Sequence, residues 1–166
     1  MEEFLALLKG HDIDTLADIR SLPGSNKYPH FNSENLASVL PQNGLQYFWL
    51  SKLGGLRRSR KEFASKNTGL TSPSFRSYAD YMATEEFREG VYELIEIASK
   101  STTAYMCAEA VYWRCHRRLL SDYLVAHGLN VTHILNLKQV SPHKMTQGSL
   151  VTSEGLVIYP SLSLPA

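Results

Sequence analysis

Apolar residues recur along this chain in two alternating patterns, which predict short helices and short strands in turn. Apolar positions spaced three and four apart predict helices within 4–10, 33–41, 74–82, 84–98 and 119–128. Between them, short apolar runs predict strands at 13–19, 45–50, 102–107 and 130–135. Such alternation is typical of a mostly parallel sheet of about four to five strands, and the last residues, 149–159, add the pattern of a C-terminal hairpin.

Three of the predicted strands carry further expectations. The run at 102–107 is continuously apolar and β-branched, so we expect it to be buried on both faces. The aromatic-rich run at 45–50 is expected to lie at the centre of the sheet. The run at 130–135 follows a helix and is expected to join the same sheet through a right-handed crossover.

Length and composition limit the class of protein. The 166 residues, 43% of them hydrophobic, predict a single α/β domain over 1–166. A net charge of +1 gives no global basic field for nucleic acid, so any anion recognition has to be local. The apolar runs are too short to cross a bilayer and no signal peptide is visible, so we expect a cytoplasmic protein. Two cysteines form no disulfide framework, and both are expected to be reduced thiols that are poorly placed for a bridge.

The segment between the strand at 102–107 and the following helix concentrates the chemistry-bearing residues. Ligands of open α/β sheets bind beyond the carboxyl ends of the strands, where a helix N-terminus also favours an anion. Cys107 ends such a strand, and Arg114 with the helix start predicts a lowered thiol pKa and a nucleophilic thiolate. The alternative is a buried structural thiol.

Cys115 precedes Leu119 by four residues, so it is predicted to share the helix face that covers the sheet and to pack in the core. Cys107, Glu109, Cys115 and His116 offer ligand types that zinc accepts. Adjacent residues project about 100° apart on a helix, however, so no metal site is predicted.

Cations at 116–118 begin a helix, where they oppose the macrodipole. A bound anion or the carboxylate of Glu109 would offset this cost. A purely structural pairing of Glu109 with Arg117 therefore remains an alternative to a site.

Polar residues also follow the two earlier strands. Asp18 and Arg20 lie on one face of a strand end and can pair with each other or flank a ligand, with Ser21 and Ser25 following. Gly54 and Gly55 precede a run of cations, at Arg57, Arg58, Arg60 and Lys61. This pattern fits either a phosphate-binding loop or a mobile basic loop. His133, alone in an apolar strand, is expected to be a hydrogen-bonded core or edge residue rather than a catalytic one.

The motif Met-Cys107-Ala-Glu109, followed by Cys-His-Arg117, Gly128 and His133, resembles the signature of the domain-of-unknown-function family numbered 488. Asp-Ile-Arg-Ser at 18–21, His143 and Tyr-Pro at 159–160 fit the same pattern, so the resemblance covers nearly the whole chain. It implies a Rossmann-like, three-layer α/β domain of cytoplasmic proteins. It implies no activity.

The residues favour an enzyme in which Cys107 is a nucleophile or redox thiol, and Glu109 and His116 move protons. The expected substrate is anionic, a nucleotide or a phosphate-bearing molecule. The residues expected to bind it are Asp18, Arg20, Ser21, Ser25, Gly54, Gly55, Arg114 and Arg117. The alternatives are a nucleotide- or nucleic-acid-binding module without turnover, and a metal-binding protein. No cofactor and no membrane partner are expected.

Overall fold

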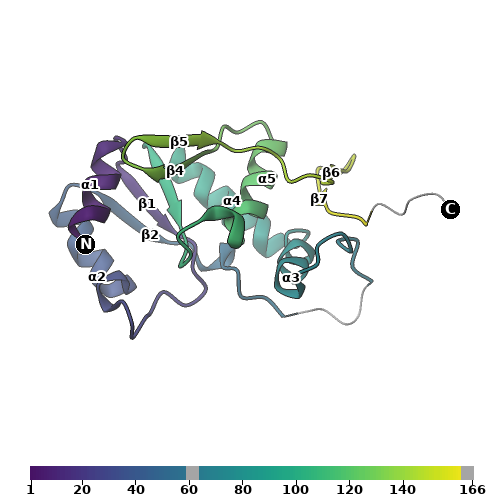
Figure 1. Ribbon diagram of the computed structural model, residues 1–166, viewed down its shortest axis with the longest axis horizontal. Coiled ribbons are helices and arrows are strands. Elements are labelled where there is room, and N and C mark those ends of the chain that lie inside the picture. The colour runs from purple at the N-terminus through teal and green to yellow at the C-terminus, as the bar shows by residue number, and fades with distance from the viewer. Residues whose placement is uncertain (59–63, 162–166) are drawn as a thin grey trace.

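The computed structural model describes residues 1–58 and 64–161, which form a mixed α/β fold (Figure 1). Its helices and strands are, in chain order, α1 (Glu2–Gly10), β1 (Thr15–Asp18), α2 (Ser33–Gln42), β2 (Gln46–Trp49), α3 (Pro73–Tyr81), α4 (Glu85–Ala98), β3 (Thr103–Met106), α5 (Arg117–Ala126), β4 (Thr132–Asn136), β5 (Gln139–Pro142), β6 (Leu150–Val151) and β7 (Val157–Ile158). The predicted helices are therefore confirmed. Along the longest axis, α1 and α2 lie toward one end and β6–β7 toward the other.

Strands β1, β2 and β3 form a parallel sheet in the order β2-β1-β3. Every residue of β1 is buried, whereas β2 is an edge strand in which Phe48 and Trp49 are exposed. The expected central position of the run at 45–50 is therefore wrong. The expectation that 102–107 is buried on both faces is wrong as well, because β3 forms the other edge and is only partly buried.

Alternate residues of β1 supply two apolar clusters on opposite faces of the sheet. Leu16 packs in a cluster with residues of α1 and α2, such as Leu8 and Leu36. Ala17 packs in a cluster with residues of α3, α4 and α5, such as Phe87 and Leu119. Helices therefore cover both faces, as in the three-layer arrangement that the sequence predicts.

Strand β4 pairs antiparallel with β5 and not with β3, so the crossover predicted for 130–135 is wrong. The physical reason is the short connection at Leu137 and Lys138, which returns the chain at once and satisfies β4 locally. The hairpin is tied to the end of α1 by a 2.9 Å hydrogen bond between His11 Nε2 and the carbonyl oxygen of Asn136. Among the described residues the parallel sheet consequently has three strands and not four to five.

Strands β6 and β7 form an antiparallel pair, which confirms the predicted C-terminal hairpin. Val157 and Tyr159 are buried in the same cluster as α3, α4 and α5. Across 1–58 and 64–161, the helices lack the length and apolar character that spanning a bilayer requires.

Candidate thiol site

The carboxyl ends of the parallel strands bring distant segments together. Ser21, after β1, accepts a hydrogen bond at Oγ from the backbone N–H of Leu56, 2.9 Å away. Gly54, after β2, lies so close to Ser21 that a Cβ added to it would stand 2.8 Å from the Ser21 Cα. His116 Nε2, before α5, lies 3.1 Å from the carbonyl oxygen of Ile19. These segments therefore share one edge of the sheet.

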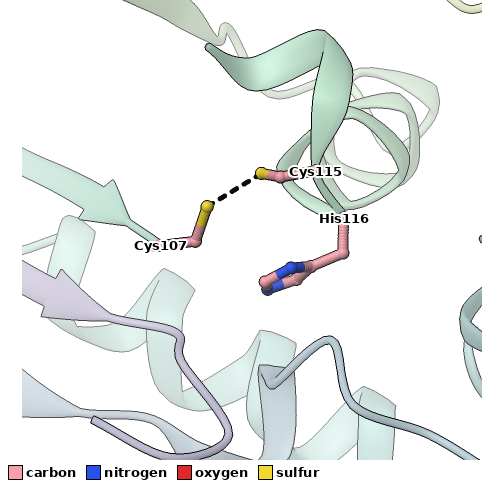
Figure 2. Close-up of side chains that lie close together, drawn as sticks. All are labelled: Cys107, Cys115 and His116. Atoms are coloured by element: carbon pink, nitrogen blue, oxygen red, sulfur yellow. Dashed lines mark hydrogen bonds between the residues drawn. The ribbon is translucent and has the colours of Figure 1, made fainter. Parts of the chain in front are cut away.

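Two cysteines from different elements meet at this edge. Figure 2 shows Cys107 at the end of β3 and Cys115 and His116 at the start of α5. The two Sγ atoms are 2.9 Å apart, and the Cys107 thiol donates to the Cys115 sulfur. Both cysteines are free thiols, as expected. A disulfide bond measures about 2.05 Å, so the sulfurs are already close to bonding distance, contrary to the placement that the sequence predicts.

Arg117 directs two donors at the same sulfur. Its backbone N–H and its Nε lie 3.2 and 3.1 Å from the Cys115 Sγ. The hydrogen bond from Cys107, together with Arg117, lowers the pKa of the Cys115 thiol to about 6, although burial opposes this shift. The pKa of Cys107 is raised, because its proton is held by Cys115 and because it is partly buried. The two opposite shifts favour a thiolate on Cys115 and a protonated thiol on Cys107.

The two sulfurs differ in their exposure. Cys115 is only 4% exposed, whereas Cys107 is partly exposed. A reagent from solvent therefore reaches the Cys107 sulfur first. Cys115 is buried as expected, but its sulfur accepts hydrogen bonds from Cys107 and Arg117, so it is more than a core-packing group.

Glu109 and Arg114 lie on the open side of the cluster, and both are exposed. The Glu109 backbone N–H donates to the Cys107 sulfur at 3.3 Å, and the Glu109 carbonyl accepts a bond from Arg117 Nη2. The Glu109 carboxylate makes no ion pair with Arg117 within the part of the chain that the structure describes. The loop is therefore held by its backbone, and both charged side chains are available to solvent.

His116 is partly buried and packs against Gly55 and Tyr78. The Tyr78 ring centroid lies 5.0 Å away, and a Cβ added to Gly55 would approach His116 Nδ1 to 2.4 Å. Burial lowers the pKa of His116 to about 4, so the ring is neutral at pH 7. Because a carbonyl oxygen only accepts, the ring donates from Nε2 to Ile19 and keeps Nδ1 as its acceptor.

A sulfur of each cysteine and a ring nitrogen of His116 lie within 4.8 Å of one another, a spacing that can hold a metal ion. Cys115 and His116 were expected to diverge because both would lie on a helix. The φ of −138° and ψ of 169° at Cys115 are extended instead, because α5 begins only at Arg117. The sulfurs are nevertheless closer than the roughly 3.8 Å that two thiolates on a tetrahedral zinc ion require. The described geometry fits two thiols that share a proton better than it fits two metal ligands.

Asp18 and Arg20 pair with each other, which was one of the two alternatives. Arg20 donates from Nε to Asp18 Oδ1 at 2.8 Å and from Nη2 to the Phe31 carbonyl at 2.7 Å, and Tyr47 donates its hydroxyl to Asp18. Asp18 is fully buried and Arg20 is 7% exposed. No hydrogen bond joins Arg20 to either cysteine in the described part of the chain.

Ser25 fixes its own loop. Its Oγ accepts from the Tyr28 N–H, and its N–H donates to the Asn32 side chain. It makes no hydrogen bond to the thiol cluster within 1–58 and 64–161. A role in substrate binding therefore remains a prediction for Ser25, as it does for Asp18 and Arg20.

The loop after β2 is held by Arg57. Its guanidinium donates to the carbonyls of Ser51, Lys52 and Gly54 and lies 3.7 Å from the centre of the Tyr81 ring. Arg60 and Lys61 of the same cationic run lie outside the described residues. Phosphate binding by Gly54 and Gly55 stays a prediction. Their close approach to Ser21 and His116 already requires the absence of a side chain.

A second polar cluster, which the sequence did not predict, joins α5 to the β4–β5 hairpin. Buried Asp122 Oδ1 and His143 Nε2 are 2.8 Å apart, and His143 Nδ1 is 2.8 Å from His133 Nε2. Tyr112, from the loop between the cysteines, stacks on His133 with ring centroids 3.4 Å apart. His133 is thus the hydrogen-bonded buried residue that was expected. The sequence feature that could have indicated this cluster was His143, which is one of the residues that carried the family resemblance.

The fold and site define a class of protein: an α/β domain with a proton-sharing cysteine pair at the carboxyl edge of a parallel sheet. The chain belongs to the family described as Domain of unknown function DUF488, which matches residues 1–124. That match confirms the resemblance, and it contains both cysteines and Arg117. No curated protein and no solved structure matches the chain.

Proposed function

We propose that the protein is an enzyme that uses the Cys107–Cys115 pair as its reactive group on an anionic substrate. The observation that carries this proposal is the 2.9 Å contact between the two sulfurs, one of which accepts two hydrogen bonds from Arg117. Adjacent sulfurs with one shared proton support thiol–disulfide exchange best among thiol reactions.

The reaction begins at the exposed sulfur. Cys115 takes the proton of Cys107 while the Cys107 sulfur attacks one sulfur of the substrate disulfide, and the other substrate sulfur leaves as a thiolate. Cys115 then releases its proton to solvent and attacks Cys107, so that a Cys107–Cys115 disulfide forms and the second thiolate leaves. The protein loses two electrons and the substrate disulfide gains them.

Arg114 supports the anionic character of the substrate. It is exposed, it precedes Cys115 directly, and its guanidinium makes no hydrogen bond or ion pair in the described part of the chain. We assign to Arg114 the binding of the negative group of the substrate. The Glu109 carboxylate and His116 Nδ1 are the groups that we propose pass the proton released by Cys115 on to solvent. A nucleotide or phosphate-bearing substrate remains a prediction.

The test uses Ellman's reagent, an anionic aromatic disulfide, and 4,4′-dithiodipyridine as its neutral counterpart. Native protein is expected to release two thiolates per chain and to end as the internal disulfide, because both cysteines react in sequence. Cys115→Ser should release one and keep a mixed disulfide on Cys107. Arg114→Gln should slow the anionic reagent more than the neutral one. Native protein that reacts no faster at pH 6.5 than a small-molecule thiol would contradict the proposal.

A metal site is the second candidate, because three ligand atoms lie within 4.8 Å of one another. Cobalt(II) titration tests it through the absorption bands of thiolate-bound cobalt. Binding that His116→Gln abolishes and exposed His30→Gln leaves intact would favour the metal. The absence of such bands would favour the free thiol pair.

A nucleotide- or nucleic-acid-binding module without turnover remains a prediction too. Arg57 is engaged within its own loop, and Arg60 and Lys61 lie outside the described residues. No contact among the described residues favours this alternative over thiol chemistry.

A further inference from the structure

A cavity of about 590 Å³ follows the unpaired edge of β3 and separates it from β4. Its walls are mostly apolar and come from α1, α4, β3 and β4, and Phe4, Ala98, Ala104 and Ile134 are among them. The cavity exists because β4 pairs with β5 and leaves the place beside β3 unfilled. Its size is in the range that small-molecule sites occupy.

The charged groups of this cavity are of one sign. Arg117 lines it, whereas no aspartate or glutamate of the described residues does. Arg117 bonds the Cys115 sulfur and the Glu109 carbonyl through Nε and Nη2, and its Nη1 makes no hydrogen bond in the described part of the chain. A guanidinium in an otherwise apolar wall favours an anionic group beside it.

His133 supplies a second, independent polar group. It is 8% exposed and lines the same cavity. With both imidazoles neutral, His143 donates from Nε2 to the ionised Asp122, which only accepts, and it accepts at Nδ1 from His133 Nε2. This series of hydrogen bonds leaves His133 Nδ1 with a free lone pair and no hydrogen-bond partner within 1–58 and 64–161. The ring of Tyr112, stacked on His133, fixes the orientation of the imidazole.

We infer that this cavity binds a small organic acid with an apolar body, its acid group on Arg117 and an N–H or O–H donor on His133 Nδ1. The inference goes beyond the proposed function, because it needs neither sulfur. Binding should persist in Cys107→Ser, which loses disulfide exchange, so the two proposals fail separately.

Indole-3-acetate is a suitable probe, since it combines an aromatic body, a carboxylate and an N–H donor. In calorimetric titration we expect saturable binding to one site. Neutral indole, and 1-methylindole-3-acetate without the N–H, should each bind about tenfold more weakly.

The site is located with two tryptophan substitutions on α4. Ala98 is exposed and lines the cavity, so Ala98→Trp covers its opening without entering the core, and binding should be lost. Glu93 is exposed on the same helix outside the cavity, so Glu93→Trp should bind as the native protein does. Absence of saturable binding, equal affinity for indole, or unchanged binding by Ala98→Trp would each overturn the inference.

Discussion

Arg117 shows how one residue can create a reactive group from a neighbour. Because it starts α5 two positions after Cys115, its backbone N–H and its guanidinium both reach the same sulfur. The cations at 116–118 oppose the macrodipole at this helix start and need a compensating anion, as the sequence predicts. The structure supplies one within the chain, since a thiolate at Cys115 is stabilised by the helix N-terminus as well as by Arg117.

Replacement of Arg117 by glutamine should raise the pKa of the thiol pair from about 6 by roughly one unit, because a charged donor to the Cys115 sulfur is lost. The ultraviolet absorbance of the thiolate, followed against pH, measures this shift. Arg114→Gln is the matched control, since it removes the same charge nearby without a bond to sulfur. Equal pKa values in the two variants would contradict the role of Arg117.

Gly54 is a residue whose importance is steric. A Cβ at this position would stand 2.8 Å from Ser21 Cα and 2.9 Å from Ser21 N, and backbone atoms cannot move aside cheaply. Gly54→Ala should therefore reduce the free energy of unfolding by about 1–3 kcal/mol in urea denaturation. Gly24→Ala, where a Cβ meets nothing within 4 Å, should leave stability nearly unchanged. Similar losses in both variants would show that crowding is not the cause.

At the scale of elements, the hairpin β4–β5 is anchored to α5 by buried polar groups. Burial tends to raise the pKa of Asp122, but the hydrogen bonds from His143 and Thr146 outweigh it and keep the pKa below its usual value. Burial lowers the pKa of His133 to about 4. The anchor thus favours a charged Asp122 and a neutral His133.

His133 in this anchor, together with His116 in the thiol site, predicts a loss of stability in acid. In the unfolded chain His133 and His116 bind protons near pH 6.5, whereas in the folded chain their pKa values of about 4 delay protonation to about pH 4. The free energy of unfolding should therefore fall between these pH values by on the order of 1 kcal/mol per histidine. Below that range, protonation of Asp122 adds a further loss.

Denaturation curves at pH 7 and pH 5 check this prediction, and His133→Gln should flatten the pH dependence. His30→Gln, a change at an exposed site, is the control. A stability that is the same at both pH values would contradict the assignment.

At the scale of the molecule, the sequence predicted the helices, three of the four strands expected in the parallel sheet and the terminal hairpin, because each has a local periodic pattern. It could not predict that β4 would leave the sheet. The apolar pattern of residues 130–135 fits either sheet, and the choice depends on the short turn to β5 and on the contact of His11 with Asn136. The site was predicted only in part. Cys107 and Arg117 could be placed because a strand end and a helix start have local sequence patterns, whereas no local pattern indicates the extended conformation of Cys115.

Residues beyond the family match complete the core. Tyr159 is 2% exposed and donates its hydroxyl to Asp122 at 2.8 Å. Tyr159→Ala should reduce the free energy of unfolding by about 3–5 kcal/mol, as expected for the loss of a large buried aromatic side chain. Val151→Ala, in the exposed part of the same hairpin, should change it by less than about 0.5 kcal/mol. Thermal or urea unfolding measures both variants, and equal effects would argue that the hairpin lies outside the cooperative unit.

The stack of Tyr112 on His133 links the two regions of the molecule that we consider functional. Tyr112 lies between Cys107 and Cys115 in the chain, and its ring also lines the cavity beside β3. Because Tyr112 lies in the loop that joins the two cysteines, we expect formation of a Cys107–Cys115 disulfide to shift this ring. By thermodynamic reciprocity, an acid held in the cavity then shifts the reduction potential of the cysteines by as much as their oxidation shifts its affinity.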